Sequence, residues 1–234
     1  MAPFGITITL ATIIAEETGF TGDIPRLPDN LVNFDVSFAY MTGGLIDANF
    51  ENLELLNFVD LDGNAFNSTI PSVFGRLPSL GFLYLSDAVV SGDLSFMSGM
   101  PSIRELWIDT NPGLNGPIFD FIGDLTTLES WSMTFNSLTG TLPSSLGNLS
   151  NMNQMWLYAN QLTGTIPAEL ANNVNMRILQ LEGNSFTGSM PTEICANRVF
   201  PTGTASIETL GADCADENFE CSCCTCCSVL ACTT

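Results

Sequence analysis

Histidine and lysine are both absent from this sequence of 234 residues. The absence of histidine excludes Ser-His and Cys-His nucleophile systems, and the absence of lysine excludes Schiff-base chemistry. Five arginines face 25 acidic residues, which gives a formal net charge of -20. Nucleic acid is therefore not an expected partner, because phosphate neutralisation needs a basic patch. The arginines are Arg26, Arg76, Arg104, Arg177 and Arg198.

Cysteine is absent from the first 194 residues, and all eight cysteines fall in the last forty. This crowding at one end predicts a disulfide-stapled cap and an oxidising compartment. Overlapping C-x-x-C pairs are also a metal-binding pattern, and the sequence does not choose a pairing. The cysteines are Cys195, Cys214, Cys221, Cys223, Cys224, Cys226, Cys227 and Cys232.

The sequence lacks an apolar run long enough to cross a bilayer. The run from Ala2 to Ala15 is too short. We expect it to form a first strand, and the alternative is the remnant of a targeting peptide. No transmembrane segment is predicted, and peripheral association with a membrane complex stays open.

A phrase of the form L-x-L-x-x-N recurs along most of the chain. Its second apolar positions are separated by 25, 24, 23, 25, 24 and 24 residues, and such a fixed interval is typical of a solenoid. Alternating apolar residues predict a short strand with one buried face, and the asparagine amide can bond backbone groups where the chain turns. The second apolar positions are Val36, Leu61, Leu85, Ile108, Met133, Leu157 and Leu181.

A second phrase, L/F-x-G-x-I/L-P, recurs after the strands, with Ser68 in place of the glycine in one unit and Phe119 in place of the proline in another. It supplies an apolar anchor, a glycine for a tight turn and a proline that stops strand pairing. One such unit cannot bury its apolar stripe alone, whereas stacked units can. The asparagine column is interrupted by Ala39 and Ala88.

Taken together, the two phrases resemble the plant-type extracellular leucine-rich repeat of receptor-kinase ectodomains and polygalacturonase-inhibiting proteins. The resemblance runs from Thr18 to Ile194, and the tail ADCADENFECSCCTCC is similar to that of secreted microalgal leucine-rich-repeat proteins. It implies an α/β repeat fold, a solenoid of about eight repeats with a concave parallel β-sheet and a disulfide-rich C-terminal cap. We expect an N-terminal strand and degenerate repeat over 1–30, repeats over 31–194 and the cap over 195–234.

Three columns of residues are expected to face outward from this sheet, because side chains alternate along a strand. The middle column is Asp35, Asp60, Tyr84, Trp107, Ser132, Trp156 and Gln180. The column before it is Asn33, Phe58, Phe82, Glu105, Ser130, Gln154 and Ile178. The column after it is Ser37, Asp62, Ser86, Asp109, Thr134, Tyr158 and Glu182.

Aromatic residues in these columns form the candidate ligand-binding site. Rings with a polar edge suit recognition of peptides or sugars, and Trp and Tyr are frequent binding hot spots. The alternative is that the rings only stabilise the sheet by cross-strand pairing. The predicted ligand-binding residues are Tyr84, Trp107, Asp109, Trp156 and Tyr158. Trp131 occupies a leucine position, so we predict that it lies in the core.

Asp35, Asp60 and Asp62 form the candidate metal site. Like charges directly opposite one another destabilise a sheet, and Ca²⁺ could bridge these carboxylates. The alternative is an ordinary acidic surface separated by water and salt. No other cofactor is expected.

Two Asn-x-Ser/Thr sequons, at Asn67 and Asn148, are candidate glycosylation sites and agree with a secreted, extracellular or cell-wall protein. A carboxylate pair such as Asp60 with Asp109 is the remaining catalytic option, but an open sheet does not exclude water. The sequence therefore predicts that this protein is not an enzyme. It favours a recognition module for a protein, peptide or cell-wall glycan, and the alternative is a structural scaffold subunit.

Thiol titration of the native protein tests the disulfide interpretation of the cysteines. Without reductant the denatured protein should show no free thiol, and with reductant it should show eight. Bound metal released on denaturation, together with free thiols before reduction, would support the metal interpretation instead.

Overall fold

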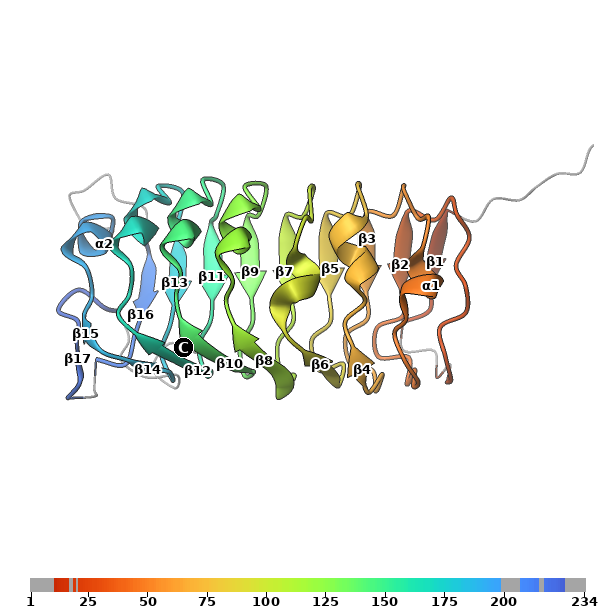
Figure 1. Cartoon of the computed structure of the whole chain (residues 1–234), viewed down its shortest axis with the longest axis horizontal. Helices are drawn as coiled ribbons and strands as arrows, with labels where there is room; N and C mark the ends of the chain where they lie inside the picture. The colour runs from red at the N-terminus through yellow and green to blue at the C-terminus, as the bar shows by residue number, and fades with distance from the viewer. Residues whose placement is uncertain (1–10, 17–18, 20, 199–206, 215–216, 226–234) are drawn as a thin grey trace, which may run out of the picture.

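The structure is a computed structural model that describes residues 11–16, 19, 21–198, 207–214 and 217–225. Its repeats stack side by side in chain order along the longest axis of the molecule (Figure 1). The short strands of one repeat pair in parallel with those of the next. The predicted solenoid is confirmed.

The main sheet has nine parallel strands among the described residues, and each strand comes from a different coil of the solenoid. The strands, in their order across the sheet, are β1 (Thr12–Ile14), β2 (Asn33–Asp35), β3 (Phe58–Asp60), β5 (Phe82–Tyr84), β7 (Glu105–Trp107), β9 (Ser130–Ser132), β11 (Gln154–Trp156), β13 (Ile178–Gln180) and β16 (Thr209–Gly211). The first strand, β1, lies inside the apolar run for which a strand was expected. The last strand, β16, lies in the segment predicted to be the cap, so the sheet continues past the last repeat.

The register of the main sheet matches the sequence alignment. Leu83 pairs with Leu106, which pairs with Trp131, and Trp131 pairs with Met155. Two residues beyond Leu83, the backbone N–H of Leu85 donates to the carbonyl of Trp107 at 2.9 Å, and the same 2.9 Å bond recurs at the next three repeats. Those repeats contribute Ile108, Met133 and Leu157, all fully buried. Trp131 is also fully buried, as predicted.

A second parallel sheet runs along another side of the coils, and the sequence analysis missed it (Figure 1). Its strands are β4 (Ser68–Thr69), β6 (Val90–Gly92), β8 (Gly113–Pro117), β10 (Ser137–Thr141), β12 (Gln161–Gly164) and β14 (Ser185–Phe186). These strands fall in the L/F-x-G-x-I/L-P phrases, for which only a tight turn and an end to strand pairing were predicted. The turn is present, because Gly140 and Gly164 have φ of 78° and 77°, but the flanking residues still pair with the next repeat.

Short helical turns complete each coil between the second sheet and the next main-sheet strand. They are α1 (Asp47–Phe50), η1 (Ser72–Arg76), η2 (Leu94–Met97), η3 (Asp120–Asp124), η4 (Ser144–Asn148), η5 (Ala168–Asn172) and α2 (Thr192–Ala196), where η denotes a 3₁₀ helix. A Cβ at Gly123 or Gly147 would lie 2.3 Å from a backbone carbonyl oxygen of the next turn, so glycine allows the turns to stack closely. No helix in the described part of the chain is long and apolar enough to span a membrane.

Buried or partly buried asparagines join most coils to the preceding one. The Asn136 side chain accepts from the backbone N–H of Asn111 at 2.9 Å and donates to the carbonyl of Ile108 at 2.7 Å. Asn64, Asn111, Asn160 and Asn184 make the corresponding bonds in their own repeats. The predicted role of the asparagine column is therefore confirmed.

The interruption of this column at Ala88 is compensated by the backbone. In the regular repeats, the side-chain oxygen of an asparagine accepts a hydrogen bond from a backbone N–H of the preceding repeat. That N–H lies two residues beyond the preceding repeat's own column position, as in the 3.0 Å bond from Leu138 to Asn160. The corresponding N–H, that of Phe66, donates instead to the backbone carbonyl of Ala88 at 3.2 Å. The backbone N–H of Phe66 therefore keeps a hydrogen-bond partner.

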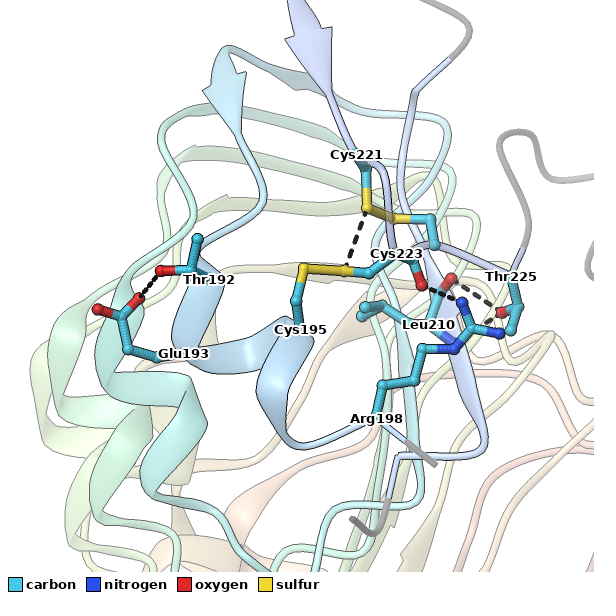
Figure 2. The surroundings of a disulfide bond; sticks show 9 residues. Thr192, Glu193, Cys195, Arg198, Leu210, Cys221, Cys223 and Thr225 are labelled. Atoms are coloured by element: carbon cyan, nitrogen blue, oxygen red, sulfur yellow. Dashed lines mark hydrogen bonds between the residues drawn. A yellow bond between two sulfur atoms is a disulfide. The ribbon is translucent and has the colours of Figure 1, made fainter. Parts of the chain in front are cut away.

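Disulfides and hydrogen bonds tie the C-terminal segment to the last coil, as Figure 2 shows. Cys195 of α2 is bonded to Cys223, and Cys221 is bonded to Cys224. The two bridges contact each other, with 3.8 Å between the sulfurs of Cys221 and Cys223. The backbone N–H of Thr225 donates to the carbonyl of Leu210 in β16 at 2.8 Å. The third sheet, β15 (Gly188–Ser189) with β17 (Phe219–Glu220), adds a further connection.

These disulfides confirm a disulfide-stapled cap. Cys214 is disulfide-bonded as well. Cys226, Cys227 and Cys232 lie outside the described residues, so the prediction for them stays a prediction.

Replacing Asn136 by alanine should destabilise the stack by about 2 to 4 kcal/mol, because a buried N–H and a buried carbonyl each lose a partner. The measurement is urea denaturation followed by circular dichroism. Asn115→Ala is the matched control, since its exposed amide bonds only the carbonyl of Gly113, and it should shift stability by less than about 0.5 kcal/mol. Equal effects of the two substitutions would contradict the structural role of the column.

Candidate ligand-binding face

The aromatic residues of the middle column lie next to one another on the main sheet. Tyr84 pairs with Trp107 across β5 and β7, and Ser132 of β9 separates Trp107 from Trp156. The rings of Tyr84 and Trp107 have centroids 5.3 Å apart, and those of Trp107 and Trp156 are 6.3 Å apart in an edge-to-face arrangement. Phe58 extends the row, 5.6 Å from Tyr84. Each ring thus contacts the next. The row of rings runs from β3 through β5 and β7 to β11 and passes over β9, where the small Ser132 stands.

Hydrogen bonds fix two of these rings. The hydroxyl of Tyr84 donates to Oε2 of Glu105 at 2.8 Å, and the indole N–H of Trp107 donates to Oγ of Ser130 at 2.9 Å. Burial, and then the bond to Glu105, raises the pKa of Tyr84, so the hydroxyl stays protonated and keeps donating. The rings are therefore held in place before any ligand arrives.

A shallow hollow of about 190 Å³ opens beside the two tryptophans. It is lined by Trp107, Asp109, Ser132, Thr134, Trp156 and Tyr158. Four of the five predicted ligand-binding residues thus share one hollow, and the fifth, Tyr84, contacts Trp107 at its side. The hollow exists because β9 carries small side chains between two strands that carry tryptophan.

Asp109 reaches across to the neighbouring repeat. Its Oδ1 accepts from the hydroxyl of Ser132 at 2.7 Å, from the backbone N–H of Thr134 at 2.6 Å and from the hydroxyl of Thr134 at 2.8 Å. These bonds hold the carboxylate at the side of the hollow, and they leave Oδ2 without a hydrogen-bond partner among the described residues. Asp109 therefore has a structural role that the sequence did not reveal.

Several residues of the outward columns are buried, contrary to the prediction that they face solvent. Bulky neighbours cover the small side chains on β9, and at β13 Gln180 donates to Glu182 at 3.0 Å. Burial raises the pKa of Glu182. The residues concerned are Ser37, Ser130, Ser132, Thr134, Gln180 and Glu182.

Three exposed aromatic residues at the rim of the sheet were missed. Phe38, Tyr40 and Phe135 are 54%, 69% and 48% exposed, compared with 37% for Trp107. Phe38 and Phe135 both precede the asparagine column and have positive φ, and the ring of Phe38 lies where a Cβ on Gly63 would be. A fourth column, one residue beyond the column that contains Ser37 and Thr134, would have included Phe38 and Phe135.

The carboxylates of the candidate metal site are neighbours, as the register predicted. Asp35 pairs with Asp60 across β2 and β3, and Asp62 follows on the same face. Burial, and then the charge of Asp35, raises the pKa of Asp60 to about 6. Burial, and then the charge of Asp60, raises the pKa of Asp62 to about 7. Protonation is thus one way in which the repulsion is relieved.

No group of three acidic, cysteine or histidine side chains in the described part of the chain is placed to hold a metal ion. The calcium hypothesis for Asp35, Asp60 and Asp62 therefore stays a prediction. Both sequon asparagines, Asn67 and Asn148, are exposed, and their glycosylation also stays a prediction.

Comparison with known proteins yields no match to any family model and no match to a curated protein. Solved structures do match. The structure of PEPR1 with AtPEP1 is 31% identical, with a TM-score of 0.68 over 73% of this chain and 24% of that chain. The plant peptide hormone receptor RGFR1 in complex with RGF2 is 24% identical, with a TM-score of 0.71 over 86% and 34%.

The ectodomain of the Arabidopsis receptor kinase HAESA, in complex with an N-terminally extended IDA peptide hormone ligand, is 28% identical, with a TM-score of 0.65 over 75% of this chain and 30% of that chain. This chain thus spans between a quarter and a third of the length of these solved receptor chains. Its stacked coils define it as a leucine-rich-repeat protein. Its repeats are of the plant type that these receptor ectodomains share.

The raised pKa values of Asp60 and Asp62 predict a stability that falls with rising pH. Below about pH 4 both groups are protonated in the folded and unfolded chain. Between about pH 4 and pH 7 the unfolded chain releases these protons first, so folding stability is lost across that window. Asp62→Asn should flatten the decline of the melting temperature from pH 4 to pH 7.5.

Asp93→Asn is the control for this pH dependence. Hydrogen bonds from Ser95 lower the pKa of Asp93, so its contribution is lost as pH falls and not as pH rises. This variant should keep the wild-type decline above pH 4. An Asp62→Asn protein with an unchanged decline would contradict the assignment.

Millimolar calcium in the same melting experiment decides the metal hypothesis. A rise in melting temperature that is lost in Asp60→Asn would support a bridging ion. No shift in the wild-type protein would remove the hypothesis.

Proposed function

We propose that this chain is a non-catalytic, extracellular recognition module that binds an extended peptide on the open face of its main sheet. The observation that carries the proposal is the row of partly exposed rings from Phe58 to Trp156, fixed before binding and adjoining the hollow beside Trp107. Rigid aromatic anchors lose little conformational entropy on binding, so more of the contact energy appears as affinity.

The solved neighbours support a peptide as the ligand. RGFR1 and HAESA are described as complexes with peptide hormones, and their coils stack as those of this chain do. The hollow of about 190 Å³ suits one side chain better than a whole drug-sized molecule, which fits an extended peptide lying along the sheet. A cell-wall glycan is the competing ligand, since sugars also stack on tryptophan.

A structural scaffold subunit is the second candidate function, and one observation favours it. The first coil has an apolar hollow of about 270 Å³ whose lining includes Ile13, Phe34 and Val36. Among the described residues, β1 is also the edge strand of the main sheet. An edge strand beside an apolar hollow can pair with another chain. Native mass spectrometry distinguishes the two functions, because a stable assembly supports the scaffold and a monomer supports recognition.

Replacing Trp107 and Trp156 together by alanine should reduce peptide binding at least 100-fold, since tryptophan hot spots contribute about 2 kcal/mol or more each. The melting temperature should fall by only about 2 to 6 °C, because the rings are partly exposed and the lost aromatic contact is worth about 1 kcal/mol. Binding is measured by calorimetry with peptides recovered from a random display library.

The control is Phe119→Ala with Phe121→Ala, which removes a stacked ring pair, 5.2 Å between centroids, near η3 and outside the main sheet. This variant should bind the same peptides as the wild-type protein does. A display library that yields no peptide dependent on Trp107 and Trp156 would overturn the proposed function. Binding of cell-wall oligosaccharides with the same tryptophan dependence would replace the peptide by a glycan.

A further inference from the structure

The hollow beside Trp107 and Trp156 combines aromatic walls with a negative charge. Trp107, Trp156 and Tyr158 supply the rings, and Asp109 supplies the carboxylate. The floor consists of Ser132 and Thr134, which are both buried and both bonded to Asp109. The carboxylate is therefore fixed, with three bonds on Oδ1 and its Oδ2 left for another donor.

The three outward columns that surround the hollow supply no compensating positive charge. The three outward columns contain five further acids, Asp35, Asp60, Asp62, Glu105 and Glu182, and no arginine. Burial is the main cause of the raised pKa of Asp62, and the charge of Asp109, two repeats away in the same column, adds to it. Arg104 and Arg177 stand directly before β7 and β13, outside the three columns. Their side chains lie beside Glu129 and Glu208.

A cation gains two interactions in this hollow. The faces of tryptophan and tyrosine rings attract positive charge, by about 0.5 to 2 kcal/mol according to how far the cation is desolvated. A carboxylate adjoining the rings adds a charge-assisted hydrogen bond. A neutral apolar side chain would gain only the ring contact, and an acidic one would be repelled.

We propose that this hollow is a subsite for one basic side chain, arginine or lysine, of the extended peptide. The proposal rests on the proposed function, because it names the chemistry of the partner at that same face. The alkyl stem of the basic residue packs against the rings, and its charged head lies beside Oδ2 of Asp109. The volume of about 190 Å³ accommodates one such side chain.

The test uses a random linear peptide library displayed on phage, selected on the whole chain and counter-selected on the Trp107→Ala, Trp156→Ala variant. The recovered peptides should share a basic residue at one position. Replacing that residue by citrulline or norleucine, which keep the stem and lose the charge, should weaken binding about tenfold or more.

Asp109→Asn supplies the second arm of the test. Asparagine keeps an oxygen that can accept the bonds from Ser132 and Thr134, so the hollow should persist, as an unchanged melting temperature would show. Affinity for the basic peptide should fall about tenfold, and affinity for the citrulline peptide should not change. Asp120→Asn is the matched control, since Asp120 is exposed at the start of η3, outside the main sheet.

The outcomes separate this inference from the proposed function. Tryptophan-dependent peptides without a common basic residue, or a citrulline peptide that binds as tightly as the basic one, would overturn the subsite and leave the proposed function standing. No tryptophan-dependent peptide at all would overturn both. Equal losses for the basic and citrulline peptides on Asp109→Asn would show that Asp109 only supports the hollow.

Discussion

The structure depends on satisfying the backbone of each coil from the coil beside it. Short strands and tight turns leave many N–H and C=O groups that a single coil cannot pair, and an unpaired buried group destabilises the fold. Strand pairing satisfies some of them, and the asparagine column satisfies others at the turn where no strand can continue. Where the column holds Ala88, a backbone carbonyl accepts the bond instead, so the requirement is met even when the side chain is absent.

Fixed stacking has a direct consequence for the candidate ligand-binding face. Because Trp107, Ser132 and Trp156 occupy equivalent positions in successive repeats, a small residue on β9 is flanked by two large ones. The side chains of Trp107 and Trp156 flank Ser132, so Ser132 is buried and forms the bottom of the hollow. The same stacking buries Asp60 and brings Asp35 beside it, and both effects raise the pKa of Asp60. The candidate binding hollow and the electrostatic repulsion thus arise from one geometric rule.

Much of the fold could be predicted from the sequence because the repeat interval reports contacts between neighbours. The nearly constant spacing favours one register, so the alignment of Leu83, Leu106 and Met155 and the burial of Trp131 were predictable. The second sheet was not, since its glycine phrases have the composition of turns and pair only when stacking brings them together. The structural bonds of Asp109 were also missed, because they depend on side-chain direction across two repeats.

The sequence by itself determined the solenoid, its register, the disulfide-rich cap and the column to which each aromatic and acidic residue belongs. Only the tertiary structure decided which members of those columns remain exposed. The physical reason is that burial on a sheet face depends on the sizes of the side chains in the flanking repeats, which a single column of letters does not contain. Ser132, Thr134 and Glu182 are therefore covered, whereas Phe38 and Phe135 at the rim are not.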